Sequence, residues 1–191
     1  MSVTSLLSSL KRALLPQKPF ISELSKIIDS NKFIDDTFNI EEPFAITIID
    51  SGSSIHVSSN VHFRKFCNII VAKGGRLDIG SNVFFNNYCS VNCLMEIVIG
   101  ENTLFGEGVK IYDHNHLYSI TEDRVLNVDR NEFKTGAVKI GKNCWIGSQV
   151  VILPNVSIGD NVIIGANNLI YKSIPPNVIV KQHSNTIIET L

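Results

Sequence analysis

Six isoleucines recur at a strict spacing of six residues, and this spacing constrains the fold more than any other feature of the chain. They are Ile140, Ile146, Ile152, Ile158, Ile164 and Ile170. An α-helix would scatter such a set over all of its faces, because its period is about 3.6 residues. A meander of hairpins would instead show turn residues about every 8–12 residues. The spacing therefore excludes a helical bundle and a simple antiparallel sheet for this region.

A three-sided coil satisfies the spacing. Each group of six residues would form one short strand and one corner, and three groups would complete a turn of ~18 residues with a shared interior. Glycine follows the isoleucine in four of the six groups, and asparagine stands three places after it in four. Both residue types tolerate the positive φ that tight corners need. The sequence thus predicts an all-β parallel β-helix, with the isoleucines inside it.

The six-residue repeat is less regular before residue 140 and is absent from one segment. Ile79, Phe85, Val91, Ile99 and Phe105 continue the pattern, with one step of eight residues that predicts a bulged corner. The polar segment 113–137 breaks the repeat, and a long loop inside a regular repeat is usually functional. We expect residues 1–45 to form a helical or irregular N-terminal segment, with helices over 6–14 and 21–28. Residues 46–180 are the predicted coil, with its loop excursion at 113–137, and 181–191 a C-terminal tail.

Composition excludes several classes of protein. Seventeen Lys and Arg against eighteen Asp and Glu leave no basic surface for nucleic acid. No apolar run reaches the ~20 residues of an integral membrane segment. The four cysteines lack the spacing of a zinc ribbon, so we interpret them as small buried residues. Because the N-terminal residues lack the pattern of a signal peptide, we expect a cytoplasmic protein.

Residues 79–180 resemble the hexapeptide-repeat acyltransferases, whose fold is a left-handed parallel β-helix. The resemblance rests on the Ile-Gly-x-Asn repeats, the histidines that follow 109–112, the run Asn143-Cys144-Trp145-Ile146-Gly147-Ser148, and residues 174–178. It is strongest to the sugar O-acetyltransferases, including those of capsular polysaccharides. It implies an enzyme that uses acetyl-CoA as co-substrate and no metal. It also implies a saccharide acceptor and a homotrimer whose active sites lie between subunits.

The resemblance also implies roles for seven residues of this chain. In that family a loop histidine takes the proton from the acceptor hydroxyl, for which the ordinary pKa of histidine, about 6.5, is suited. This general base falls on His116, with His114 as the competing candidate; if the stretch is extended, both side chains lie on one face. The acceptor would contact Asn86 and Trp145, and the cofactor would contact Ser148, Ala166 and Lys172. Simpler interpretations stay open: a corner asparagine, a packing tryptophan, a solvated lysine, and loop histidines that are only hydrogen-bonded.

The chain departs from the family's pattern in two places. After Val178 it lacks the family's Gly-x-Pro-Ala stretch, which helps to hold the nucleotide of CoA; Lys181 is the candidate for a phosphate contact. The loop between His116 and Trp145 is longer than in galactoside-type relatives, so acceptor specificity does not transfer.

Three other functions remain open at this stage. They are N-acetylation of a nucleotide-linked amino sugar, a zinc hydratase with histidine ligands, and a β-helix without catalytic activity. Residues 1–50 lack a nucleotide-binding glycine fingerprint, and no third histidine convincingly joins His114 and His116.

Overall fold

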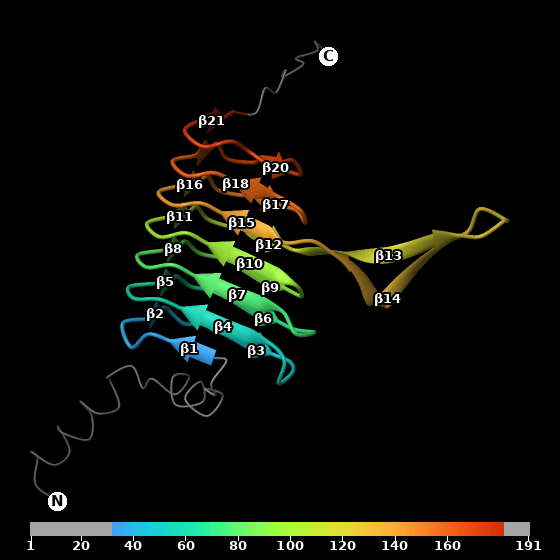
Figure 1. Ribbon diagram of the computed structural model, residues 1–191, viewed down its shortest axis with the longest axis horizontal. Helices are drawn as coiled ribbons and strands as arrows, with labels where there is room; N and C mark the ends of the chain where they lie inside the picture. The colour runs from blue at the N-terminus through green and yellow to red at the C-terminus, as the bar shows by residue number, and fades with distance from the viewer. Residues whose placement is uncertain (1–31, 182–191) are drawn as a thin grey trace, which may run out of the picture.

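The computed structural model describes residues 32–181, which form a three-sided coil of short parallel strands with one long projection (Figure 1). Sheet A contains β1 (Lys32–Ile34), β4 (Ser54–Val57), β7 (Arg76–Ile79), β10 (Glu96–Ile99), β15 (Val138–Ile140) and β18 (Ser157–Ile158). Sheet B contains β2 (Asn39–Ile40), β5 (His62–Phe63), β8 (Phe84–Phe85), β11 (Leu104–Phe105), β16 (Trp145–Ile146), β19 (Ile163–Ile164) and β21 (Ile179–Val180). Sheet C contains β3 (Phe44–Ile48), β6 (Cys67–Val71), β9 (Ser90–Cys93), β12 (Lys110–Tyr112), β17 (Val151–Ile152) and β20 (Leu169–Ile170). The projection is a hairpin of β13 (His114–Ile120) and β14 (Leu126–Thr135), which we call the arm.

The repeated isoleucines lie inside the coil, as the spacing predicts. All six are at most 5% exposed. Residues eighteen apart are neighbours in parallel register, as in the pairs Ile140 with Ile158 and Ile152 with Ile170. Each strand thus buries its inward side chain against its counterpart in the next coil, and the parallel β-helix is confirmed. Its left-handed sense stays a prediction from the resemblance.

Asparagines form a continuous ladder at the corner between sheets A and B. Six of them adopt a left-handed backbone with φ between 55° and 62°. Their side-chain amides also hydrogen-bond from one coil to the next, at distances of 2.9 to 3.3 Å. The ladder consists of Asn60, Asn82, Asn102, Asn143, Asn161 and Asn177. The recurring asparagine therefore serves both the turn geometry and the contact between coils.

Phenylalanines replace the isoleucines on the inner side of sheet B in the lower coils. The ring of Phe85 lies 4.1 Å from that of Phe63 and 4.4 Å from that of Phe105, with the planes within 7° of parallel. All three side chains are fully buried. This column of rings is a large part of the core below the coil that carries the arm.

The coil begins earlier than expected. Strands β1 and β2 already belong to sheets A and B. The described residues before 46 are therefore part of the parallel β-helix and not a separate segment. Ile34, Ile40 and Ile46 pack on the core at the same spacing of six, which is the signal that the predicted boundary missed. The helices expected over 6–14 and 21–28 lie outside the described residues, as does most of the tail 181–191.

The predicted excursion at 113–137 is present and is an ordered hairpin. It leaves sheet C after β12 and returns to sheet A at β15, so the arm projects from the corner between these sheets (Figure 1). Within residues 32–181, no helix has the length and apolar character needed to cross a bilayer.

Candidate active site

The arm carries both candidate histidines on β13. His114 pairs with Thr135, and His116 pairs with Phe133. The register then shifts before Tyr118, which pairs with Val128, so residues 129–132 bulge out of β14. Bulges of this kind commonly direct a side chain next to a functional site.

His116 is held by this bulge. Its Nδ1 lies 2.9 Å from the carbonyl oxygen of Asp129. A carbonyl can only accept, so Nδ1 carries the hydrogen and the lone pair of the neutral ring is on Nε2. The Asp129 carboxylate in turn accepts the amides of Asn131 and Glu132 at 2.8 and 3.0 Å, and these hydrogen bonds lower its pKa. The bulge thus fixes an exposed imidazole with Nε2 available as a base.

His114 is held by a carboxylate. Its Nδ1 lies 3.0 Å from Oδ1 of Asp113, whose side chain is fully buried, while the imidazole is 15% exposed. Burial alone would raise the pKa of Asp113, but the hydrogen bonds from His114, Leu94 and Met95 outweigh it and the pKa lies below its ordinary value. The ionised carboxylate can only accept, so Nδ1 of His114 is also the protonated nitrogen.

Both imidazoles lie on one face of the arm, as expected for positions two apart in a strand. The ring of Phe133 lies 5.2 Å from that of His114 and 4.6 Å from that of His116. Lys73, from the corner between β6 and β7, lies over the Phe133 ring at 4.8 Å and donates to the carbonyl of Asn131. The arm is therefore held against the coil close to the two histidines.

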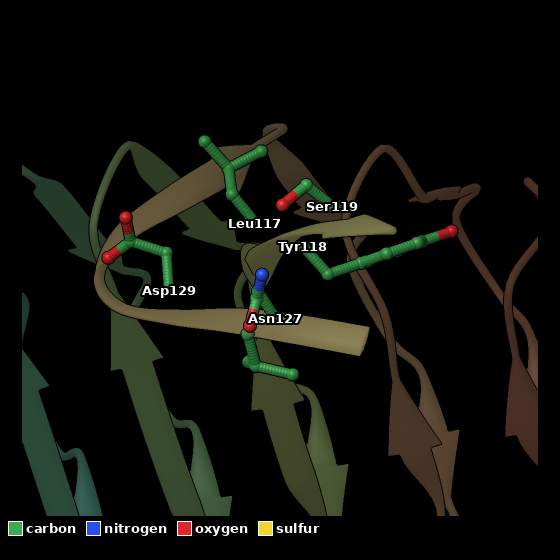
Figure 2. A pocket seen from close by; sticks show the side chains of 6 residues that line it. Leu117, Tyr118, Ser119, Asn127 and Asp129 are labelled. Carbon is green, nitrogen blue, oxygen red and sulfur yellow. The ribbon is translucent and has the colours of Figure 1, made fainter. Parts of the chain in front are cut away.

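A hollow of about 470 Å³ lies on the arm beyond His116. Figure 2 shows Leu117, Tyr118 and Ser119 lining it from one strand, with Asn127 and Asp129 opposite. It is open to solvent, and Tyr118 is 69% exposed. An aromatic ring beside amide, hydroxyl and carboxylate groups can bind a molecule that carries both apolar faces and hydroxyl groups, such as a sugar.

Three other predicted residues gather at the corner between sheets B and C. Asn86, Ser148 and Ala166 follow β8, β16 and β19, whose strands are linked through β11 in parallel register. The coils approach closely here: a Cβ on Gly106 would lie 2.5 Å from the Ser148 nitrogen, and one on Gly147 would lie 2.6 Å from the Ala166 nitrogen. Gly106 and Gly147 are themselves buried, so glycine is needed there to let successive coils pack together. Ser148 is partly exposed and Ala166 is exposed, and we call this accessible part of the corner the backbone strip.

The remaining candidates lie on two other surfaces. Trp145 is 56% exposed on the outer side of sheet B, in one row with the exposed Leu104, Ile163 and Ile179. Lys172 follows β20 at the corner between sheets C and A, with its Nζ 5.5 Å from the Tyr171 ring.

Within one chain, the predicted site is divided. His114 and His116 lie close together on the arm, and Ser148 and Ala166 lie close together at the corner between sheets B and C. The two pairs are thus on different edges of the coil. Asn86 is partly occupied within its own corner, because its Oδ1 accepts from the Asn87 amide at 2.8 Å.

The residues that hold the histidines were not predicted from the sequence. Asp113 immediately precedes His114 in the sequence, and this adjacency was the available signal. Asp129 and Phe133 become neighbours of the histidines only through the hairpin register, for which the sequence carries no comparable signal.

The structure also shows the state of the cysteines and the arrangement of residues that could bind a metal. All four cysteines are free and buried, as interpreted, and burial raises the pKa of the Cys144 thiol. In the described part of the chain, no group of three His, Cys, Asp or Glu side chains is placed to hold a metal ion.

Comparison with known proteins gives a consistent group of relatives. The family described as bacterial transferase hexapeptide (six repeats) matches residues 137–172. Galactoside O-acetyltransferase of Escherichia coli strain K12 is 41% identical over 85 residues, which are 44% of this chain and 38% of that protein. A putative lipopolysaccharide biosynthesis O-acetyl transferase of the same strain is 35% identical over 88 residues, 44% of this chain and 45% of that protein. The matches thus span less than half the length of these two relatives.

Similarity to solved structures extends over most of the chain. A maltose O-acetyltransferase from Clostridium difficile 630 superposes with a TM-score of 0.52 and 27% identity. The superposition covers 92% of this chain and 79% of that one.

Proposed function

Because the sequence and the fold fit the hexapeptide-repeat acyltransferase family, we propose that this protein transfers the acetyl group of acetyl-CoA to a hydroxyl group of a saccharide. The observation that carries the proposal is the His116 imidazole on the arm. Its Nδ1 is committed to the Asp129 carbonyl, and its Nε2 is left as a proton acceptor. The relatives include a galactoside and a maltose O-acetyltransferase, and this favours oxygen as the acceptor atom.

In the proposed reaction His116 acts as general base. Nε2 takes the proton of the acceptor hydroxyl as its oxygen attacks the thioester carbonyl, and no acyl-enzyme forms. The imidazolium then returns this proton to the departing thiolate, so that the products are the acetyl ester and free CoA. A neutral ring with a fixed Nδ1 hydrogen is suited to both transfers, because it changes charge without reorienting.

The backbone strip along the B–C corner is the proposed place for the pantetheine arm of CoA. Ser148, which is partly exposed, and Ala166, which is exposed, lie there and are accessible to a ligand. Lys172 lies on the same edge as the arm, two coils beyond β12, and is the proposed contact on the other side of the cofactor. Lys181, the candidate for a phosphate contact, is the last described residue.

A homotrimer would complete this site. The histidines and the backbone strip lie on different edges of one chain, so an arm from one copy and a B–C corner from the next would have to meet. The outer surfaces of the sheets support such an assembly. Sheet A carries an ion-pair network of Arg76, Glu96 and Lys139, which suits solvent, whereas sheet B presents the apolar row that includes Trp145.

The acceptor is proposed to be a unit of a surface polysaccharide or of its precursor. The putative lipopolysaccharide biosynthesis enzyme among the relatives supports this class. The hollow beside His116, with Tyr118, Ser119 and Asn127, would hold the sugar, with Asn86 and Trp145 contributed across the interface. Acetyl-CoA and the four free cysteines are both consistent with work in the cytoplasm.

The test is an acceptor screen with acetyl-CoA that measures the release of free thiol. We use p-nitrophenyl glycosides of galactose, glucose and N-acetylglucosamine, an amino sugar, and oligosaccharides of surface polysaccharides. Thiol release should require a hydroxyl acceptor, and His116→Ala should reduce turnover by ~10²–10⁴. His56→Ala is the matched control, because this exposed histidine lies in β4 and stacks on Phe33 at 5.1 Å.

Each other outcome has a definite meaning. If free thiol were released only with the amino sugar, the enzyme would be an N-acetyltransferase and the proposed O-acetylation would be wrong. No release with any acceptor, or wild-type turnover by His116→Ala, would contradict the proposal.

A further inference from the structure

Asp113 is a buried carboxylate that the proposed reaction does not use. Among residues 32–181 it is the only buried acidic residue, and it is 0% exposed. It stands where the six-residue repeat ends and the arm begins, directly before His114. A carboxylate in such a place needs partners, because burying an unpaired charge is strongly unfavourable.

Its partners come from both the coil and the arm. The amide of Leu94 donates to both carboxylate oxygens at 2.9 Å, and the amide of Met95 donates to Oδ2 at 2.7 Å. These two residues form the corner of the coil next to the arm. The third donor is Nδ1 of His114, at 3.0 Å from Oδ1. The Asp113 carboxylate therefore links the first residue of the arm, His114, to the backbone of the neighbouring coil.

The two histidines, which share one face of the arm, consequently have the same tautomer. Each Nδ1 donates to a fixed oxygen, and each Nε2 is a hydrogen-bond acceptor with no partner among the described residues. The proposed reaction consumes one such acceptor, at His116. A second acceptor on the same face is matched to a second hydroxyl donor, which a saccharide has and a simple alcohol lacks.

We propose that Asp113 is a positioning residue: it fixes His114 so that Nε2 accepts a hydrogen bond from a second hydroxyl group of the acceptor saccharide, while His116 deprotonates the first. This inference rests on the proposed function and narrows its acceptor to a sugar unit with two free hydroxyl groups within reach of the arm. Asp113 itself touches neither hydroxyl and acts through His114.

The first variant is Asp113→Asn, which has the same shape. Its amide oxygen can still accept from Leu94 and Met95, but its NH₂ group faces Nδ1 of His114. Nδ1 must then accept, so the hydrogen moves to Nε2 and His114 becomes a donor on the acceptor's side. The loss of one hydrogen bond should raise the KM for the saccharide about tenfold, with kcat within about twofold of wild type.

A double-mutant cycle with His114→Ala separates this role from a purely structural one. If Asp113 acts through His114, then Asp113→Asn should change KM in the wild-type background and have no further effect beside His114→Ala. The substrate is the best glycoside of the thiol-release screen, together with its analogues lacking single hydroxyl groups. With the wild type, one such analogue should have a higher KM than the full glycoside. With His114→Ala, the KM of this analogue and that of the full glycoside should be equal.

Asp50→Asn is the matched control. Asp50 accepts the amides of Ser53 at 2.9 Å and Gly74 at 3.2 Å, at the same C–A corner, but it touches no imidazole. It should lower stability without changing the KM for the saccharide.

Nitrogen-15 NMR of the histidine rings reads the tautomer directly and needs neither a variant nor an acceptor. At neutral pH, His114 of the wild type should carry its hydrogen on Nδ1. A hydrogen on Nε2, an unchanged KM in Asp113→Asn, or equal effects of Asp113→Asn in both backgrounds would each overturn the inference. Failure of acetyl transfer by the wild type would instead overturn the proposed function, whatever the tautomer.

Discussion

Removing the ring of Phe85 should test how the stacked coils are stabilised. Phe85 is fully buried between Phe63 at 4.1 Å and Phe105 at 4.4 Å. Truncation of a buried phenylalanine to alanine costs about 3–5 kcal/mol, and each aromatic pair adds about 0.5–1.5 kcal/mol beyond its buried area. Because both pairs are lost and the cavity is closed on every side, we expect Phe85→Ala to lie at the upper end, about 4–5 kcal/mol.

Phe66→Ala is the matched control. Its ring stacks on Tyr88 at 4.9 Å with the planes 4° apart, but it is 51% exposed on the outside of the coil. It loses one aromatic pair and about half the buried area of a core ring, so we expect a smaller loss of about 1–2 kcal/mol. Phe85→Leu, which keeps most of the volume, should fall between the two.

The measurement is urea unfolding at one fixed protein concentration, since association contributes to apparent stability. In thermal unfolding the same difference corresponds to about 2–4 °C per kcal/mol for a chain of this size. If Phe66→Ala cost as much as Phe85→Ala, burial in the coil would not be the origin of the stability, and the reasoning would be refuted.

Three further predictions follow from the corners and the arm. Asn102 has φ 57° and bonds to the asparagines above and below it, so Asn102→Ala should be about 1 kcal/mol less stable than Asn102→Gly, which tolerates this backbone; equal urea midpoints would contradict this. Gly106→Ala would place a Cβ 2.5 Å from the Ser148 nitrogen and should raise the KM for acetyl-CoA several-fold, whereas Gly52→Ala, whose Cβ meets nothing closer than 3.5 Å, should leave it unchanged. The pKa of Asp113 is lower in the folded protein than in the unfolded chain, so its contribution is present above about pH 4 and is lost as the pH falls through the folded value. The stability difference between wild type and Asp113→Asn should accordingly shrink in urea titrations carried from pH 6 to pH 2, and a constant difference would show that ionisation of this carboxyl is irrelevant.

Much of the fold could be predicted because a period of six has one physical solution. The buried Ile140 and Ile158 are eighteen residues apart, which is one full turn of the three-sided coil, and this places them next to each other. The first coil was missed because Ile34, Ile40 and Ile46 occur once, before an irregular stretch, and three residues do not establish a period. They are also only partly buried, at the end of the coil.

The site could be predicted less completely, because its geometry depends on the hairpin. The sequence indicates His114 and His116 on one face, and their common contact with Phe133 agrees with this. It does not indicate that residues 129–132 bulge, so the partner of His116 was not foreseeable. The division of the site between two edges follows from counting strands around the coil, which requires the register of every strand.

Complementation between subunits tests the central claim most directly, namely that an arm histidine of one copy serves the B–C corner of the next. His116→Ala removes the proposed base, and Ala166→Trp fills the proposed cofactor strip at an exposed position. Each variant alone should release little thiol from acetyl-CoA. In trimers assembled from equal amounts of both, a site is intact when its arm and its corner are each wild type, which gives about one quarter of wild-type activity. Recovery near that value is the predicted result, and no recovery from fully mixed trimers would contradict the account.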